Sequence, residues 1–229
     1  MGKTESKQKS KIHTPLEYYY FPISQPARTV HALLLVNNIP FEPKIVNFFT
    51  GETRKPEFLK INPSGQVPAI KDGDFTLAEA HAILRYICNT KKVAEHWYPT
   101  NPKQRALVDW YLDWHHFNVR PITYYLRAIL AEKKGLPPGY DKEKEKEIFT
   151  AALERIETQL LETNQYLVSK DKPTIADLSA IFEICQLEAI GVDASKYKKI
   201  SEWMDRMFKI EGVAKANEEF KKFVESQKQ

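Results

Sequence analysis

The order of hydrophobic and polar positions divides the chain into two parts, and the first combines strands with helices. Between about residues 15 and 92, short runs of apolar and aromatic side chains are typical of strands. They alternate with segments whose apolar positions recur every three or four residues, which is typical of helices. The predicted elements are strands at Leu16–Phe21, Phe41–Asn47, Val67–Lys71 and Asp74–Leu77, and helices at Ala27–Asn38, Pro56–Ile61 and Glu79–Lys91.

The order of these elements predicts a thioredoxin-like α/β domain. A strand, a helix and a second strand form a parallel pair, because a single crossover helix joins them. The Asp72-Gly73 pair between the last two strands is a common turn of an antiparallel hairpin. The helix that follows the hairpin would cover one face of the resulting sheet.

The second part of the chain has only helical patterns. We place a linker at residues 93–101, which contains the sequence His96–Pro99, and an all-helical C-terminal domain at residues 102–229. Residues 1–14 are polar and lysine-rich, and we expect them to be a disordered tail before the domain at 15–92. The predicted helices of the second domain are Pro102–Lys134, Asp141–Val168, Thr174–Ile190, Lys196–Ile210 and Val213–Ser226.

Charge and composition exclude several classes of protein. The formal net charge is +4, but the tail has four lysines against Glu5, so the remainder is nearly neutral and offers no broad basic face for nucleic acid. No apolar run approaches the roughly 20 residues of a membrane helix. The two cysteines, Cys88 and Cys185, lack a metal-type spacing and are expected to be buried free thiols. We therefore expect a reduced, cytoplasmic protein.

The first candidate for chemistry is Ser24-Gln25-Pro26, between the first strand and the first helix. Neither end of this segment is a cysteine, so disulfide exchange is unavailable here. A hydroxyl beside a helix N-terminus, where free N–H groups favour an anion, could instead stabilise a thiolate. Taken alone, Ser24 could equally be a turn or capping residue.

Two further signals lie farther along the domain. The segment Asn62–Ala69 marks a turn that leads into a strand through Val67-Pro68. A cis peptide bond before Pro68 would leave the backbone of Val67 free to pair with an extended peptide, and a trans proline is the alternative. Glu79 opens a helix whose N–H groups suit a carboxylate, or it is a plain first-turn acid.

A metal site receives little support. Asp109, Asp113 and His116 fall on one face of a predicted helix, but a single face offers too few convergent ligands. The neighbouring Trp114 and Phe117 favour an interdomain cleft or core instead. We expect no metal.

Together, these segments resemble the cytosolic glutathione transferases, in particular the theta class. The resemblance covers about residues 15 to 225, and Thr174–Leu178 matches the family's helix-start motif, a capping box. The matching segments are Ser24–Pro26 with Arg28, Asn62-Pro63, Gly65–Ile70, Asp72-Gly73, Glu79, Ala82–Leu84, His96–Pro99 and Trp114–His116 with Asn118 and Arg120.

The resemblance implies a site and a reaction. Ser24 would be the catalytic hydroxyl that stabilises the glutathione thiolate, which then attacks an electrophilic, halogenated or peroxide substrate. Glutathione would be the co-substrate, and its binding would involve Gln25, Thr53, Arg54, Gln66, Val67, Pro68, Glu79 and Ala80. On the second-substrate side, the resemblance implies Arg120, Trp114 and Phe117. A structural salt bridge is the alternative for Arg120.

Some features depart from the family. Ala80 stands where serine is usual, Thr53 and Arg54 are not the usual residues of their loop, and the chain ends soon after Phe223, which implies a more open site. The resemblance implies a homodimer. A non-catalytic, glutathione-transferase-like module used for protein assembly is the alternative function. Ala80 mildly favours it, whereas Ser24 favours the enzyme.

Overall fold

The N-terminal half is built on a mixed four-stranded sheet. The computed structural model describes residues 15–227, and its strands run in the order β2-β1-β3-β4. β1 (Leu16–Tyr20) is parallel to β2 (Phe41–Ile45) and antiparallel to β3 (Ala69–Asp72), which forms a hairpin with β4 (Phe75–Ala78). In this register Tyr18 lies opposite both Pro43 and Ile70.

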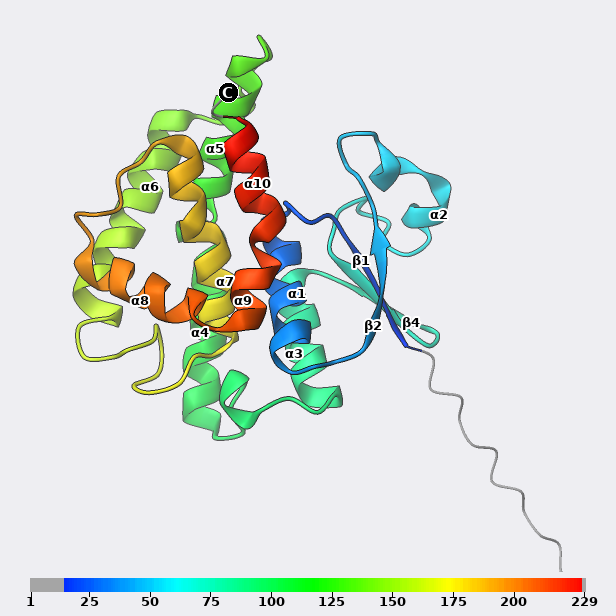
Figure 1. The fold of residues 1–229 in the computed structure, drawn as a ribbon, viewed down its shortest axis with the longest axis horizontal. Coiled ribbons are helices and arrows are strands. Elements are labelled where there is room, and N and C mark those ends of the chain that lie inside the picture. Colours follow the sequence, from blue (N-terminus) through cyan, green and yellow to red (C-terminus); the bar gives the residue numbers. More distant parts are fainter. Residues whose placement is uncertain (1–14, 228–229) are drawn as a thin grey trace, which may run out of the picture.

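Helices cover both faces of this sheet (Figure 1). α1 (Gln25–Val36) and α3 (Ala80–Thr90) pack on one face, and the short α2 (Pro56–Leu59), which follows the 3₁₀ turn η1 (Glu52–Arg54), packs on the other. Alternation along β1 explains the two layers: Tyr18 joins the core under α1, whereas Tyr19 packs beside Phe58 of α2. The N-terminal half is therefore the thioredoxin-like arrangement expected from the sequence.

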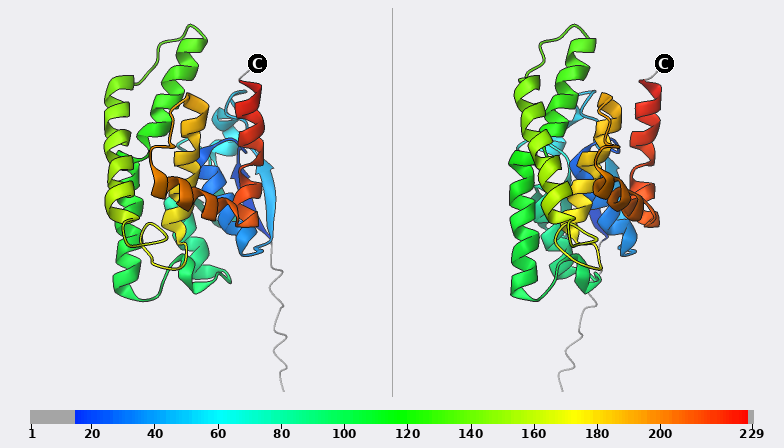
Figure 2. Two further views of the ribbon diagram at one scale, coloured as in Figure 1. Left: turned by 60° about the vertical axis from the view of Figure 1, so that its left-hand side comes forward. Right: turned by 90° about the vertical axis from the view of Figure 1, so that its left-hand side faces the viewer.

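The C-terminal half is entirely helical within the described residues and packs against α1 (Figure 2). At its centre is α7 (Ile175–Ile184), in which every residue is buried between α1, α4 and its other neighbours. The remaining elements are η2 (Glu95–Trp97), α4 (Pro102–Asn118), α5 (Pro121–Lys133), α6 (Lys142–Arg155), η3 (Ile156–Leu160), η4 (Cys185–Ile190), α8 (Lys198–Phe208), α9 (Glu211–Ala216) and α10 (Glu218–Ser226).

Several predicted helices were too long. The pattern over Pro102–Lys134 is two helices, because Pro121 lacks an N–H group and its ring would clash with the preceding turn. The pattern over Asp141–Val168 leaves α-helical geometry after Arg155, and that over Thr174–Ile190 tightens to a 3₁₀ turn after Ile184. The last predicted helix is interrupted at Asn217, whose side chain accepts a hydrogen bond from Arg28 of α1. Amphipathic periodicity alone did not reveal these interruptions.

Arg28 ties α1 to the helical half of the protein. Its side chain is 1% exposed, and its Nη2 donates to the carbonyl of Phe182 in α7 at 3.1 Å. Its Nη1 donates to Asn217, and the guanidinium carbon lies 3.9 Å from the centre of the Phe220 ring. A buried guanidinium is costly unless its donors are matched; here both terminal nitrogens have partners, whereas the buried Nε atom has none within the described residues.

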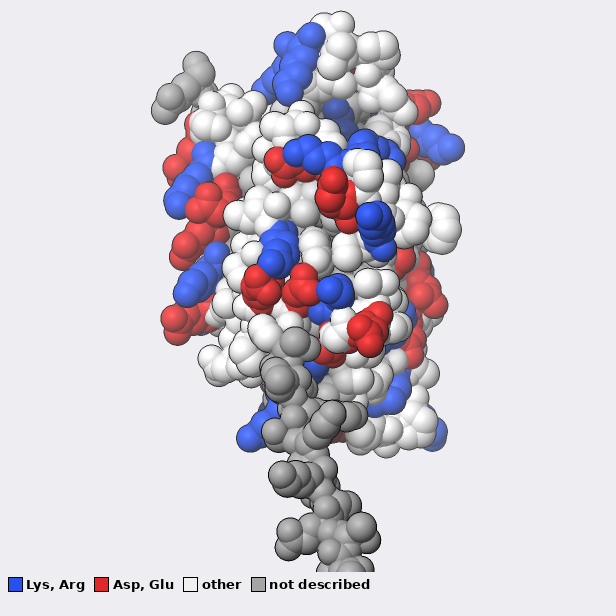
Figure 3. Space-filling view, turned by 90° about the vertical axis from the view of Figure 1, so that its right-hand side faces the viewer, with Lys and Arg blue, Asp and Glu red and all other residues white. Residues whose placement is uncertain are grey.

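Surface charge is mixed on the face formed by the N-terminal half. Figure 3 shows lysine and arginine interspersed with aspartate and glutamate over this face, without a broad area of one sign. Within residues 15–227, no helix is both long and apolar enough to cross a bilayer. The lysine-rich tail predicted at residues 1–14 lies outside the described residues.

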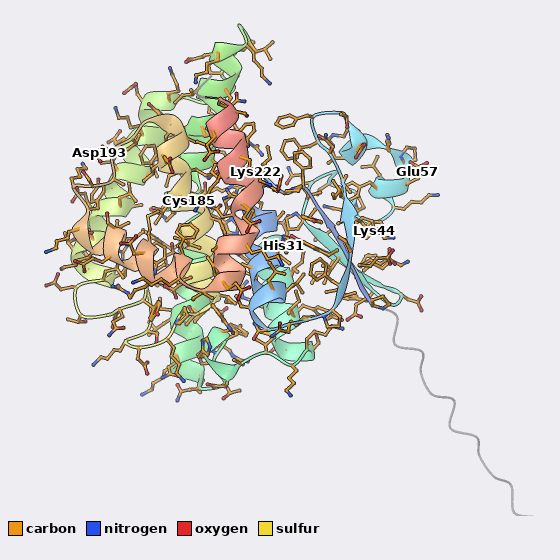
Figure 4. All side chains as sticks on the ribbon, in the orientation of Figure 1. His31, Lys44, Glu57, Cys185, Asp193 and Lys222 are labelled. Atoms are coloured by element: carbon orange, nitrogen blue, oxygen red, sulfur yellow. The ribbon has the colours of Figure 1, made fainter. Side chains whose placement is uncertain are left out.

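His31 predicts a dependence of stability on pH. This residue lies on α1 (Figure 4), between the rings of Tyr20 and Phe41 at centroid distances of 5.3 and 5.6 Å. Burial, assisted by the charge of Lys215, lowers the pKa of His31 from 6.5 to about 4. The unfolded chain therefore binds more protons between these values, so the stabilisation is complete above pH 6.5 and is lost as the pH falls towards 4.

We expect the free energy of unfolding to fall by about 1–2 kcal/mol between pH 7 and pH 5 because of His31. Urea unfolding at several pH values would measure the fall in the wild type and in His31→Leu. The variant should show a shallower slope but not a flat one, because burial also lowers the pKa of His81 and His115. Equal slopes in the two proteins would contradict this assignment.

Candidate active site

A cavity of about 470 Å³ lies between the N-terminal half and the helical half. Its walls come from the start of α1, the η1 turn, the loop before β3, the start of α3, and helices α4 and α5. Such a volume and position are usual for a small-molecule site. The residues predicted from sequence that line the cavity are Ser24, Gln25, Thr53, Arg54, Gln66, Val67, Pro68, Glu79, Ala80 and Arg120.

Ser24 is the N-cap residue of α1 and is partly buried. The helix begins at Gln25, two residues earlier than predicted, because proline is tolerated within the first turn. The Ser24 hydroxyl makes no capping hydrogen bond, so it is not used to satisfy the helix. A hydroxyl and the first N–H groups of α1 are therefore present together at the cavity wall, where they favour an anion.

The glutathione-binding role that the resemblance implies for Gln25 stays a prediction, and its side chain is bonded within the protein. It is 3% exposed, and its Nε2 donates to the carbonyl of Ser179 at 3.0 Å and more weakly to Thr29 at 3.4 Å. Its Oε1 accepts a hydrogen bond from Arg120. The amide is thus committed to α1, α7 and Arg120, which leaves the Gln25 backbone, rather than the side chain, for a ligand.

The loop before β3 carries the predicted cis peptide bond. The Val67-Pro68 bond is cis, as the sequence predicts for this site. Asn62 fixes the loop from within: its Nδ2 donates to the Gln66 carbonyl at 2.7 Å, and its Oδ1 accepts from the Ser64 N–H at 3.1 Å. Asn62 is 4% exposed, so this turn is held by buried hydrogen bonds.

Arg54 lies against the same loop. Gly65 has a left-handed φ of 63°, and a Cβ atom there would come within 2.7 Å of Arg54 Nη1. Only glycine allows this approach without a shift of the guanidinium. Arg54 Nη1 also lies 3.4 Å from the Ser64 carbonyl, a long contact that leaves most of the guanidinium's donors free. Arg54 is exposed at the cavity wall, and Thr53 is buried beside it.

The start of α3 offers a second group of backbone donors. Glu79 is the N-cap residue, with a left-handed φ of 68° that is uncommon for a residue with a side chain. Its carboxylate makes no capping hydrogen bond, so the first N–H groups of α3 do not donate to the side chain of their own N-cap residue. Ala80 is buried and contributes its N–H but no hydroxyl. This arrangement suits a ligand carboxylate beside an acidic side chain that can bind an amine.

Among the described residues, His81, His115 and His116 line the cavity. The sequence offered a chemical role only for His116, as a weak metal candidate. The His81 Nε2 lies 2.7 Å from the Ser179 hydroxyl, and the His81 and His116 rings are 4.5 Å apart between centroids. Burial lowers the pKa of His81 and of His115, so both rings are neutral at pH 7. The adjacent pair His115-His116 beside a predicted cleft helix was the available signal in the sequence.

Arg120 has a buried counter-ion. Its Nη1 lies 3.3 Å from Oε2 of Glu183, which is fully buried on α7. Burial alone would raise the pKa of Glu183, but Arg120, His115 and Thr123 together lower it, so the carboxylate is ionised. The structural salt bridge left open for Arg120 is therefore present, and the same guanidinium lines the cavity.

Trp114 and Phe117 do not line the cavity. Successive residues of a helix point in different directions, and on α4 the cavity side is taken by His115 and His116. Trp114 instead stacks on Trp110 at 5.9 Å, and the Phe117 side chain is 80% exposed. The aromatic residues that do line the cavity were not predicted, and they are Phe48 and Tyr124.

The carboxylates considered for a metal have other partners. Asp109 accepts from Arg85 Nε at 2.7 Å and from the Tyr98 hydroxyl at 3.1 Å, and Asp113 lies 3.6 Å from the same arginine. In the part of the chain that the structure describes, no three histidine, cysteine or acidic side chains are grouped to hold a metal ion. Cys88 and Cys185 are free thiols whose pKa values are raised by burial.

Family models match both halves of the chain. The model described as glutathione S-transferase, N-terminal domain, matches residues 14–89, and the corresponding C-terminal domain model matches residues 125–211. Glutathione S-transferase T1 of Arabidopsis thaliana is 37% identical over 200 residues, with 83% of this chain and 82% of the relative covered. The human theta-1 enzyme is 36% identical over 199 residues, which cover 84% of this chain and 82% of the relative.

The chain is also similar to a longer plant protein and to a solved human structure. Glutathione S-transferase T3 of A. thaliana is 36% identical over 200 residues; the match covers 83% of this chain but only 34% of that longer protein. Among solved structures, human glutathione transferase theta-2 in complex with glutathione and an unknown ligand has a TM-score of 0.83 and 30% identity. That match covers 92% of this chain and 89% of the solved chain.

Proposed function

The chain belongs to the glutathione S-transferase family, and on this premise we propose that it conjugates glutathione to small electrophiles with Ser24 as the catalytic hydroxyl. The observation that carries the assignment is the Ser24 hydroxyl at the N-terminus of α1, which lines the cavity and is not used as a helix cap. The non-catalytic assembly module is not favoured, because Ser24 lines the cavity and the matching relatives are named as transferases.

Ser24 has a defined energetic task. A free thiol has a pKa of about 8.5, so only a few per cent is ionised at pH 7. Lowering that pKa by about two units requires the thiolate to be stabilised by about 2.7 kcal/mol. A hydrogen bond from the Ser24 hydroxyl and the N-terminus of α1 can share this task, because both act on a group held out of water.

Glutathione would lie along the N-terminal half of the cavity. We propose that the α3 N-terminus binds its γ-glutamyl carboxylate, with Glu79 and Gln66 around the amine, and that the backbone of Val67 pairs with the cysteinyl part. Arg54, beside Thr53, would bind the glycyl carboxylate. Residues 15–92 would thus form the glutathione-binding domain, residues 93–101 the linker, and residues 102–229 the domain that closes the second-substrate side.

Arg120 would act near the reacting sulfur. The ion pair with Glu183 holds the Arg120 guanidinium at the cavity wall. Its positive charge is therefore already positioned before a substrate binds. Because Gln25 bonds to the same guanidinium, it serves to position Arg120 rather than to bind glutathione through its amide. The protein would therefore contribute orientation and electrostatic stabilisation instead of a covalent intermediate.

We propose a homodimer in the cytoplasm. Leu107, Trp110 and Phe117 are 50%, 37% and 80% exposed, and their spacing places them on one face of α4. An exposed apolar face of this kind favours burial against a protein partner, and the partner would be a second copy of the chain. Sedimentation equilibrium of the wild type and of Phe117→Asp would measure the assembly.

The role of Ser24 can be tested by titrating the bound thiol. We expect the thiolate absorbance of bound glutathione to show a pKa about two units below that of the free peptide, and Ser24→Ala to return it most of the way. The turnover number of the variant should fall by about 10- to 100-fold. Ser24→Thr, which keeps a hydroxyl, is the matched control and should retain part of the shift. A shift indifferent to Ser24 would move the catalytic group elsewhere.

A further inference from the structure

The helical wall of the cavity carries a cation without a protein partner. Arg127 of α5 lines the cavity and is exposed, and within residues 15–227 its guanidinium has no hydrogen bond, ion pair or aromatic face as a partner. The other arginines of the cavity differ in this respect: Arg120 is held by Gln25 and Glu183, and Arg54 contacts the Ser64 carbonyl. Arg127 is therefore free to bind an anion from the cavity.

Glutathione does not need this cation. The proposed positions for its two carboxylates, the α3 N-terminus and Arg54, both belong to the N-terminal half of the protein. Arg127 belongs to α5, in the helical half that would face the second substrate. Of the described residues that line the cavity, only Glu79 carries a carboxylate, and it is also on the glutathione side. The second-substrate side is thus electropositive without a counter-ion at Arg127.

Aromatic surface lies in the same part of the cavity. Tyr124 precedes Arg127 by three residues on α5, so both side chains lie on one face of the helix, and Tyr124 is stacked on Tyr140 with ring centroids 4.7 Å apart. Phe48, in the loop after β2, lines the cavity and packs edge-on against Phe21 at 4.8 Å. Both rings are held by aromatic neighbours, and an aromatic ligand can pack against such fixed rings.

The two walls approach each other at this end of the cavity. Lys134, directly after α5, lies with its Nζ 5.6 Å from the centre of the Phe49 ring, and Phe49 itself packs against Phe48 at 4.6 Å. The loop after β2 and the residue that follows α5 therefore lie close together, beside Phe48 of the cavity wall. A flat molecule bound there would contact aromatic side chains from both halves while a charged substituent reached Arg127.

We propose that the second-substrate side selects aromatic electrophiles that carry a retained anionic group, such as a carboxylate, and that Arg127 binds this group. The ring would pack against Phe48 and Tyr124, with the electrophilic carbon directed towards the thiolate at Ser24. This inference rests on the proposed transferase function and adds a substrate class to it. Arg127 is a binding residue, because the anion remains on the product and takes no part in the displacement.

The test compares two benzylic chlorides that differ in charge. 4-(Chloromethyl)benzoate carries a carboxylate and 4-nitrobenzyl chloride is neutral; in both, the thiolate forms the C–S bond and chloride leaves with its electron pair. Arg127→Gln should lower kcat/KM for the benzoate by about 3- to 5-fold, because an exposed ion pair is worth up to about 1 kcal/mol. For the neutral chloride the change should stay below about 2-fold.

Matched variants separate a local contact from general charge. Arg127→Glu should lower kcat/KM for the benzoate by about 10-fold or more, because it replaces attraction with repulsion. Arg127→Lys keeps the positive charge and should retain most of the wild-type ratio of kcat/KM for the benzoate to kcat/KM for the neutral chloride. Lys133→Gln removes the same charge from an exposed position on α5 that does not line the cavity. This variant should leave kcat/KM unchanged for both substrates. Added salt should reduce the difference in kcat/KM for the benzoate between the wild type and Arg127→Gln, because it screens the ion pair.

Each result has a definite meaning. If Arg127→Gln lowered kcat/KM equally for the two chlorides, or raised the KM for glutathione, Arg127 would be assigned to glutathione and the inference would be overturned. An unchanged ratio of the two kcat/KM values would overturn it as well. Turnover of the neutral chloride alone would leave the transferase function standing without this substrate class. No turnover of either chloride by the wild type would overturn the proposed function first, and this inference with it.

Discussion

Replacing Glu183 by alanine is expected to lower the free energy of unfolding by about 3–5 kcal/mol at pH 7. Glu183 is fully buried, and its Oε1 accepts from the Thr123 N–H at 2.9 Å and from Gln186 Nε2 at 2.9 Å. Its Oε2 faces Arg120 at 3.3 Å. The variant would leave a largely buried guanidinium without a counter-ion and the Thr123 N–H without its acceptor, and Gln186 Nε2 would keep only its other acceptors. Removing one partner in this way is the costly way to break a buried pair.

The cost of Glu183→Ala should depend on pH in a definite direction. Because its neighbours hold the pKa of Glu183 below 4.5 despite burial, the carboxylate stabilises the fold fully above the unfolded value. That stabilisation is lost as the pH falls through the folded pKa. The difference between wild type and variant should therefore be largest near neutral pH and smaller in acid.

Urea unfolding with two further variants would isolate the buried pair. The double variant Glu183→Ala with Arg120→Met should recover part of the lost stability, because it also removes the unpaired charge. Glu219→Ala breaks an exposed pair with Lys222 and should cost no more than about 0.5 kcal/mol. A Glu183→Ala protein as stable as Glu219→Ala would show that the pair contributes nothing to folding.

The second large effect is expected at Asp177. Replacement by alanine should lower the free energy of unfolding by about 3 kcal/mol or more, because three buried donors lose their acceptor. The carboxylate accepts from the Thr174 N–H at 2.8 Å, which completes the predicted capping box, and from the Leu167 N–H at 2.9 Å. It also accepts from Trp203 Nε1 at 2.9 Å, so one side chain joins α7, α8 and the loop before α7.

Thermal and urea unfolding of two Asp177 variants would test this role. Asp177→Asn keeps one acceptor oxygen and should lose less stability than Asp177→Ala. In both variants the near-ultraviolet signal of Trp203 should change, because its indole N–H loses or alters its partner. A loss below about 1 kcal/mol in Asp177→Ala would mean that the capping box contributes no more than an ordinary exposed N-cap.

The sequence predicted the features that depend on local pattern. The strands of the N-terminal half, the Asp72-Gly73 hairpin and the cis bond at Pro68 all follow from residues within a few positions of one another. Pro26 likewise indicated a helix start close to Ser24, although the helix begins at Gln25 rather than at Ala27 and Ser24 is its N-cap residue. The catalytic and binding roles of the cavity residues stay predictions, because their tests require a ligand.

Contacts between distant residues were not predictable. Nothing near Gln25 indicates that its amide would bond to Ser179 and Arg120, which come from α7 and the turn before α5. The facing of α4 was likewise open: periodicity marks an aromatic helix, but which side meets the cavity depends on how α3 and α7 pack against it. For this reason the sequence favoured Trp114 and Phe117, whereas the structure places His115, His116 and Tyr124 at the cavity.

The buried Arg28 limits how this protein can exchange parts with its relatives. Recombination at the linker would join α1 to a different helical half, and the guanidinium would then meet whatever side chain replaced Asn217 and whatever ring replaced Phe220. A chimaera without matching acceptors would bury an unpaired guanidinium at the interface between the two halves. A folded chimaera would therefore need an acceptor in the place of Asn217 and an apolar ring in the place of Phe220, so Arg28 is one of the residues that make the join between the halves specific.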